Sequence, residues 1–134
     1  VDDGNTVSDY DPEEIKRHVS INSSILPVEW KDVKINFIDT PGYFDFVGEE
    51  MLSTYVADAA VIVVSGKAGV EVGTEKAWDC VEKFGTPRMF FMNFMDDENA
   101  DYERVSFVII SERVLLLFRF LSMKMKKSVV SSML

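Results

Sequence analysis

The chain has 134 residues, enough for one domain with a hydrophobic core, and its 47% hydrophobic and 28% charged residues are typical of a globular protein. Its formal net charge of −9 argues against a surface that binds DNA or RNA. The single cysteine, Cys80, excludes an internal disulfide and fits a reducing, cytosolic setting. The start, Val1-Asp2-Asp3-Gly4, lacks both a methionine and an apolar stretch, so we expect a fragment or a processed product without a signal peptide.

The first predicted element is a short helix that opens at Asp11-Pro12-Glu13-Glu14 and ends near Arg17-His18. Two strands follow at residues 25–30 and 33–38, joined by a turn. Residues 46–57 then predict a helix with one apolar side, formed by Phe46, Met51, Tyr55 and Val56.

The second half alternates strands and helices. The apolar runs 59–64 and 88–92 predict buried strands, and residues 74–84 between them predict a helix that places Cys80 inside. This alternation predicts an α/β fold with a parallel central sheet flanked by helices. Because ligands of such sheets bind beyond the carboxyl ends of the strands, we expect Asp39, Ser65 and Asn93 to lie at one edge.

Asp39-Thr40-Pro41-Gly42 is the most informative motif. A carboxylate at a strand end suits magnesium held through water, and the glycine N–H has room to approach a terminal phosphate. Taken alone, the motif also fits an ordinary strand-to-helix turn.

The second motif is Asn93-Phe94-Met95-Asp96. Asp96 is able to accept two N–H bonds from the Watson–Crick edge of guanine, which adenine cannot donate. Together the two motifs predict a guanine-nucleotide site. No G-x-x-x-x-G-K-S/T phosphate loop occurs in the chain, so its usual first strand and phosphate cradle are missing.

The motifs resemble the translational GTPases, in particular an elongation-factor-G-like branch. The similarity runs over about residues 3–105, and its most specific stretches are Asp39 to Glu49, Gly69 to Trp78 and Asn93 to Tyr102. The resemblance implies a GTP-binding domain at 1–105 that binds GTP and GDP with magnesium and hydrolyses GTP on the ribosome during translation elongation. The segment beginning at Asp39 to Gly42 resembles switch II of this family, and the segment from Val7 to Ser24 resembles its switch I more loosely.

Carried over from the family, the site residues take distinct roles. Ser20 would bind magnesium through its hydroxyl, Asp39 would contact the ion through a water molecule, and Gly42 would donate its N–H to the γ-phosphate. Thr40 and Pro41 would shape that turn, with Tyr43 beside the attacking water. Asn93, Phe94, Met95 and Asp96 would form the guanine site.

Two positions depart from the family pattern. Tyr43 replaces a histidine that orients water, and tyrosine lacks the acid–base range of imidazole. Phe94 replaces a lysine that packs over the base and ties to the phosphate loop. We therefore expect the isolated chain to bind GTP weakly or not at all. A non-catalytic, GTPase-like interaction module is the alternative.

Residues 106–134 form a divergent tail with one acid, Glu112, against five basic residues. The charges within Phe107 to Leu121 argue against a membrane span, although Lys124, Lys126 and Lys127 leave a membrane-surface adaptor open. Charge, turn residues and similarity all change near Val105. We interpret this change as a domain boundary and, as a hypothesis, a shifted reading frame.

Overall fold

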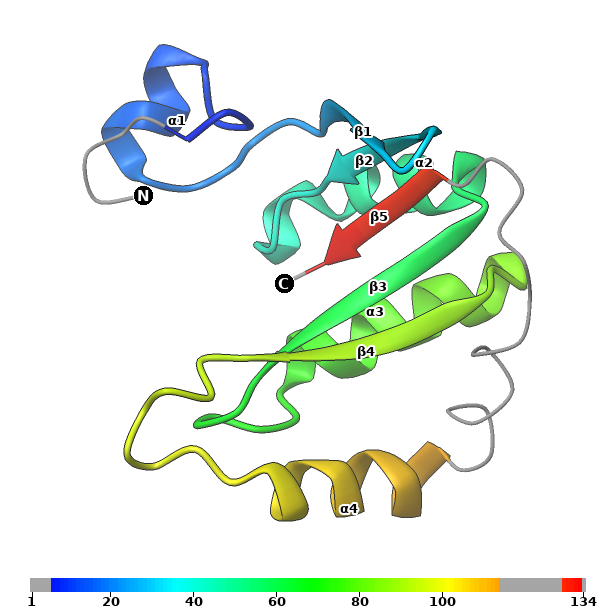
Figure 1. Cartoon of the computed structure of the whole chain (residues 1–134). Coiled ribbons are helices and arrows are strands. Elements are labelled where there is room, and N and C mark those ends of the chain that lie inside the picture. The colour runs from blue at the N-terminus through cyan, green and yellow to red at the C-terminus, as the bar shows by residue number, and fades with distance from the viewer. Residues whose placement is uncertain (1–5, 114–128, 134) are drawn as a thin grey trace.

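The computed structural model describes the backbone of residues 6–113 and 129–133, and the side chains up to residue 110. Its elements, in chain order, are α1 (Pro12–Arg17), β1 (Ser24–Trp30), β2 (Val33–Asp39), the 3-10 helix η1 (Phe44–Phe46), α2 (Val47–Val56), β3 (Ala59–Ser65), α3 (Val72–Phe84), β4 (Arg88–Asn93), α4 (Tyr102–Arg113) and β5 (Val129–Met133). The α/β fold is confirmed (Figure 1).

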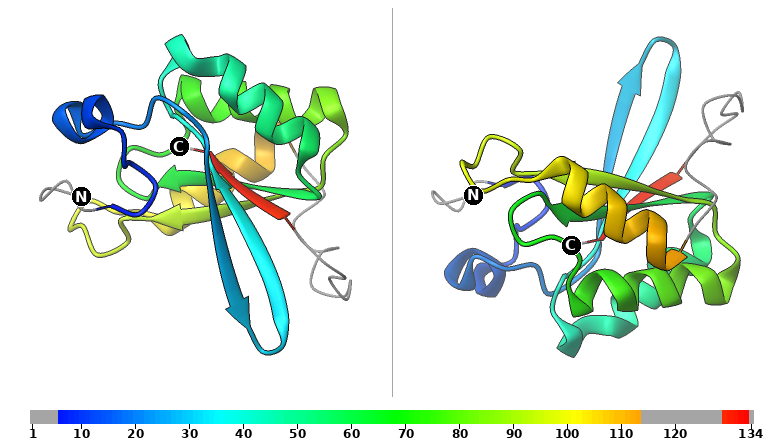
Figure 2. Two further views of the ribbon diagram at one scale, coloured as in Figure 1. Left: turned by 90° about the horizontal axis from the view of Figure 1, so that it is seen from above. Right: turned by 90° about the horizontal axis from the view of Figure 1, so that it is seen from below.

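The five strands form one sheet in the order β1-β2-β5-β3-β4. β1 and β2 are antiparallel, whereas β2, β5, β3 and β4 run parallel to their neighbours. The β1–β2 hairpin projects from the rest of the molecule (Figure 2). Its two-residue turn, Lys31-Asp32, has φ values of 47° and 62°, the left-handed conformation that matches the twist of hairpin strands.

α2 and α3 lie on one face of the sheet, and α4 lies along its β4 edge (Figures 1 and 2). The core forms between β3, α3 and α4, where a cluster of buried residues comprises Ala60, Ile62, Val64, Ala77, Trp78, Val81, Val105 and Ile109. Cys80 is buried on α3, as predicted. α3 ends at Gly85, whose φ of 66° is the left-handed C-cap conformation that glycine adopts without strain.

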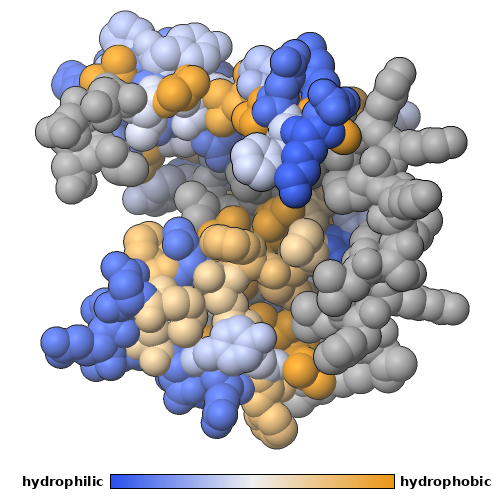
Figure 3. Space-filling model, in the orientation of Figure 1, coloured by the Kyte–Doolittle hydropathy of each residue, from blue (hydrophilic) through white to orange (hydrophobic). Residues whose placement is uncertain are grey.

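The prediction that residues 88–92 are buried throughout is wrong. Side chains alternate along β4, so that Phe90 faces α3 while Met89 and Phe91 are about half exposed. These two lie on the face turned away from α3, where hydrophobic residues gather at the surface (Figure 3). Among the described residues no helix covers this face, and a strand covered on one side only must alternate.

The predicted apolar side of the helix at 46–57 is also wrong. α2 buries Ser53 and Thr54, whereas Tyr55 and Val56 are 71% and 62% exposed. The buried hydroxyls are satisfied because Thr54 donates to the Glu50 carbonyl at 2.8 Å and Ser53 donates to Ser23 Oγ at 2.9 Å. Polar bonding therefore replaces hydrophobic burial on this helix.

The tail contains two elements that the sequence pattern did not predict. α4 runs across residue 105, and β5 joins β2 to β3. The division of the chain at residue 105 and the shifted reading frame stay predictions. The basic cluster at Lys124, Lys126 and Lys127 lies outside the described residues. None of the helices in the described part is long and apolar enough to cross a bilayer.

Candidate functional site

The turn after β2 places the first motif at the carboxyl edge of the sheet. Asp39 is the last residue of β2, and the next two residues, Thr40 and Pro41, are buried. This buried pair anchors the turn, so Gly42 and Tyr43 face outward, with Tyr43 59% exposed. Tyr43 then precedes η1, and its carbonyl accepts the N–H of Phe46 at 3.0 Å.

Ser20 reaches this edge from the segment before β1. Its hydroxyl donates to Asp9 Oδ1 at 2.7 Å, and the Thr6 hydroxyl donates to the other oxygen of Asp9 at 3.0 Å. Asp9 thereby fixes the direction of the Ser20 hydroxyl hydrogen, which leaves the lone pairs of the oxygen for another partner. The sequence motifs did not identify Asp9, because a contact across eleven positions depends on how the loop closes.

A cavity of about 910 Å³ joins the two regions. Its walls come from the segment before β1, the turn after β2, the end of β3, the start of α3 and the loop after β4. They comprise Thr6, Ser8, Asp9, His18, Val19, Ser20, Asp39, Thr40, Gly42, Tyr43, Phe44, Val63, Val64, Ser65, Glu71, Val72, Gly73, Thr74 and Phe94. Five residues predicted around the magnesium ion and the phosphate therefore share one cavity: Ser20, Asp39, Thr40, Gly42 and Tyr43.

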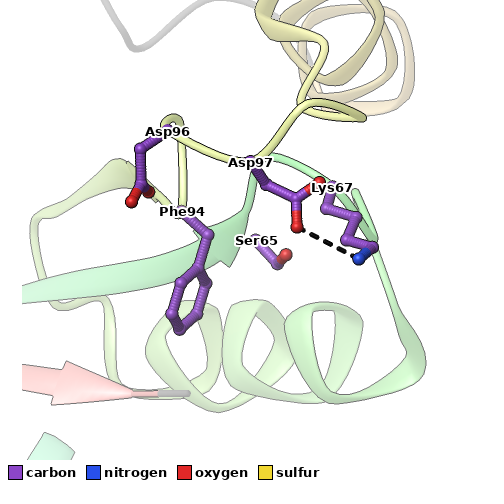
Figure 4. Close-up of a pocket in the computed structure, with 5 residues that line it drawn as sticks. All are labelled: Ser65, Lys67, Phe94, Asp96 and Asp97. Atoms are coloured by element: carbon purple, nitrogen blue, oxygen red, sulfur yellow. Dashed lines mark hydrogen bonds and ion pairs between the residues drawn. The ribbon is translucent and has the colours of Figure 1, made fainter.

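A second cavity of about 310 Å³ lies at the loop after β4 and is lined by Ser65, Lys67, Phe94, Asp96 and Asp97 (Figure 4). It shares Ser65 and Phe94 with the larger cavity, so the two spaces adjoin at the ends of β3 and β4. Phe94 has a φ of 55°, a left-handed conformation that is uncommon for a bulky residue and often marks a functional loop.

Two adjacent carboxylates in this loop have different surroundings. Asp97 pairs with Lys67 Nζ at 3.0 Å and accepts the N–H of Asn99 at 2.9 Å, and these bonds, that of Asn99 foremost, lower the pKa of the Asp97 carboxyl. Figure 4 shows Lys67 turned toward Asp97, whereas the Asp96 carboxylate points away from that pair. Asp96 therefore takes no part in the pair that Asp97 forms with Lys67.

The loops after β3 and β4 are packed closely against each other. The Gly66 N–H donates to the Asn93 carbonyl at 2.8 Å, and the Asp101 N–H donates to the Gly66 carbonyl at 3.0 Å. A Cβ on Gly66 would lie 2.5 Å from Met95 Sδ. Asn93 and Met95 support the loop in this way and, like Pro41, are not among the residues that line either cavity.

The donor set fits magnesium. The Ser20 hydroxyl and the Asp39 carboxylate are hard oxygen donors on one cavity, and magnesium binds few protein ligands when water and phosphate supply the rest. In the described part of the chain, no group of three or more His, Cys, Asp or Glu side chains is placed to hold a metal.

Acidic side chains outnumber basic ones on the described walls of both cavities. The larger cavity is lined by three acids, Asp9, Asp39 and Glu71, and one histidine, His18. The smaller cavity is lined by Asp96, Asp97 and Lys67. Lys67 is already paired with Asp97. A polyanion entering such a site without a cation meets repulsion.

Comparison with known proteins identifies the family. Residues 1–130 match the family model of the elongation factor Tu GTP binding domain. Elongation factor G 2 of Borreliella burgdorferi is 40% identical over 105 residues, which cover 78% of this chain and 16% of that protein. The mitochondrial ribosome-releasing factor 2 of Drosophila melanogaster is 44% identical over 101 residues, covering 75% of this chain and 14% of that protein. The chain thus spans 16% or less of these relatives' lengths.

Solved structures agree. A crystal structure of a protein from Thermus thermophilus matches with a TM-score of 0.78 and 37% identity, over 81% of this chain and 16% of that chain. A bacterial selenocysteine-specific elongation factor shares the fold, with a TM-score of 0.70 at 20% identity over 96% of this chain and 22% of that chain. The chain therefore belongs to the elongation factor Tu GTP-binding domain family, among translational GTPases related to elongation factor G.

Proposed function

We propose that this chain is the guanine-nucleotide-responding part of an elongation-factor-G-like translation factor. The observation that carries the proposal is the single cavity that Ser20, Asp39, Gly42 and Tyr43 share, together with the adjoining cavity at Asp96. In the intact factor, this site binds GTP with magnesium, and hydrolysis to GDP on the ribosome releases the two loops that carry Ser20 and Gly42.

Each residue has a stated task in this proposal. Ser20 and Asp39 hold the magnesium ion, which neutralises phosphate charge when bound, and the Gly42 N–H meets the γ-phosphate. Tyr43 stands beside the position of the attacking water. The carboxylate of Asp96 accepts the two guanine N–H groups, and the exposed ring of Phe94 offers a surface on which the base stacks.

The acid-lined walls and the missing phosphate loop support weak binding by the isolated chain. Without backbone N–H groups that cradle the phosphates, most phosphate affinity is lost. We expect the isolated chain to bind GTP only weakly, and a tight magnesium-dependent complex in calorimetry would contradict this expectation.

The test uses two neighbouring carboxylates. Asp96→Asn is expected to weaken binding of fluorescent GTP at least about tenfold and to improve binding of xanthosine triphosphate, which carries a carbonyl where guanine has its amino group. Asp97→Asn is the matched control, since this residue pairs with Lys67 within the loop. Equal losses in both variants, or equal binding of ATP and GTP by the unchanged chain, would overturn the guanine assignment.

A non-catalytic interaction module is the second candidate, and the replacement of the family's histidine by Tyr43 favours it. Tyr43→His separates the two candidates. If restoring an imidazole raises magnesium-dependent GTP hydrolysis, the site retains catalytic geometry. If guanine binding persists in both forms with no hydrolysis in either, the interaction module is the better description.

A further inference from the structure

The segment from residue 6 to residue 23 folds around a charged side chain. Glu14 is 1% exposed and is the only buried residue in this stretch. Its large apolar residues lie at the surface, with Val7 81% and Tyr10 71% exposed. Because hydrophobic burial contributes little here, polar contacts, those of Glu14 among them, must supply most of the order in this segment.

The Glu14 carboxylate binds the chain on both sides of α1. It accepts the N–H of Asp11 at 3.2 Å on one oxygen and the N–H groups of Ile21 and Asn22, each at 2.9 Å, on the other. Hydrogen bonds to an ionised acceptor are about twice as strong as neutral ones. The carboxylate therefore closes the loop between α1 and β1.

The Glu14 carbonyl oxygen adds two more bonds to the same loop. It accepts the N–H of His18, which caps α1 in a left-handed conformation, and the N–H of Val19 at 3.3 Å. Glu14 thus holds the two residues before Ser20 through its main chain and the two after it through its side chain. Ser20 is the residue left facing Asp9 and the cavity.

The ionisation of Glu14 agrees with this geometry. Burial by itself raises the pKa of the Glu14 carboxyl, but the backbone N–H groups of Asn22, Ile21 and Asp11 outweigh burial and leave the pKa below its usual value. The charged form therefore persists at neutral pH.

We propose that Glu14 is a positioning residue: its carboxylate holds Ile21 and Asn22 in the conformation that presents the Ser20 hydroxyl to the cavity, on the other side of Ser20 from the bonds to its own carbonyl. This inference rests on the proposed magnesium role of Ser20. We expect the loop of residues 18–22 to loosen when Glu14 loses its charge, while the sheet stays folded.

The first measurement concerns the chain without nucleotide. Glu14→Gln keeps the size of the side chain but loses the charge and one acceptor, so amide hydrogen exchange at Ile21 and Asn22 should accelerate at least about tenfold. Exchange in β3 should not change. The control is Glu13→Gln, a neighbour whose side chain is 53% exposed and pairs with Arg17 at 3.0 Å. Unchanged exchange at Ile21 and Asn22 in Glu14→Gln would overturn the inference.

The second measurement asks whether the loop presents Ser20. Mn²⁺ binding in millimolar GTP, followed by electron paramagnetic resonance, should weaken severalfold in both Glu14→Gln and Ser20→Ala, and the double variant should lose no more than Ser20→Ala alone. Glu14→Asp, which retains the charge, should recover part of the loss.

The outcomes separate the two proposals. If Ser20→Ala leaves Mn²⁺ binding unchanged, the magnesium role is wrong, whatever the exchange data show, and the inference loses its basis. If Ser20→Ala weakens Mn²⁺ binding but Glu14→Gln only accelerates exchange, Glu14 orders the loop without positioning Ser20, and the inference is overturned.

Discussion

Ser20 donates its hydroxyl hydrogen to Oδ1 of Asp9, eleven residues earlier, at 2.7 Å. Both residues line the cavity that also contains Asp39. The hydrogen bond points the hydroxyl proton at Asp9, so the oxygen lone pairs are available to a cation from the cavity side. Asp9 thus prepares Ser20 for the magnesium role proposed above.

Removing that acceptor charge should loosen the cation. In Asp9→Asn, the Ser20 hydroxyl loses a charge-assisted bond, and we expect the half-saturating Mg²⁺ concentration for GTP binding to rise roughly threefold or more. A magnesium titration followed by NMR measures this change. Asp45→Asn, at an exposed carboxylate in η1, is the control. An equal rise in the half-saturating Mg²⁺ concentration in both variants would contradict this account, because it would show that the loss of any negative charge is sufficient.

Glycine at residue 66 is required by close packing. Gly66→Ala would bring a Cβ to 2.5 Å from Met95 Sδ and 3.2 Å from the Asn93 carbonyl oxygen, so we expect a destabilisation of about 1–3 kcal/mol in urea unfolding. Gly48→Ala is the contrast, because nothing lies within 4 Å of its Cβ in helix α2. That variant should be neutral or more stable by up to about 1 kcal/mol. Equal losses would refute the packing argument.

The two adjacent phenylalanines of β4 should differ in their effect on stability. Phe90 packs on the core and stacks on Trp78 with ring centroids 5.6 Å apart, so Phe90→Ala should cost about 3 kcal/mol. Phe91 is 54% exposed, and Phe91→Ala should cost less than about 1 kcal/mol. Denaturant unfolding of both variants measures the difference, and a larger loss at Phe91 would show that its face is covered.

Glu50 should make stability depend on pH. Its Oε1 is buried without a hydrogen-bond partner in the described structure, and burial raises the pKa of its carboxyl, partly offset by Lys76. Because the pKa of Glu50 is higher in the folded chain than in the unfolded chain, protonation of Glu50 favours folding. That contribution to the free energy of unfolding is complete below the unfolded-state pKa and is lost as pH rises through the folded-state pKa.

It follows that Glu50→Gln should be more stable than the unchanged chain at neutral pH, by about 1–3 °C in Tm, with the gain shrinking in acid. Thermal unfolding across pH 4–8 measures this, with exposed Glu29→Gln as the control. A gain that is the same at every pH would show that Glu50 is not the titrating group.

Much of the fold follows from local sequence signals. The cap at Asp11-Pro12 and the stop at Gly85 lie where residue type predicts them, because each depends on a few neighbouring residues. The hairpin turn, expected over Trp30 to Asp32, consists of Lys31 and Asp32 alone, since Trp30 is the last residue of β1. The burial of β4 was not predictable from its run of apolar residues. Whether Phe91 is covered depends on what packs against the far face of the sheet.

The site shows the same division. The residues predicted around the cation and phosphate share a cavity, since the carboxyl ends of parallel strands meet at one edge. Asp9 belongs to no motif, and Glu14 belongs only to the helix start Asp11-Pro12-Glu13-Glu14, which does not indicate its bonds to Ile21 and Asn22. Both act through loop closure, in which side chains bind backbone and hydroxyl groups seven to eleven positions away. The roles assigned to the site residues stay predictions.

The central claim is that the two adjoining cavities form one magnesium-dependent guanine-nucleotide site. NMR titration of the chain with millimolar GTP tests this most directly, because it detects weak binding and locates it. We predict that the amide signals of Ser20, Gly42 and Asp96 shift together with one dissociation constant, only when Mg²⁺ is present, and that Mg²⁺ with ATP does not reproduce the shifts. Shifts confined to one cavity, or identical shifts with ATP, would contradict the claim.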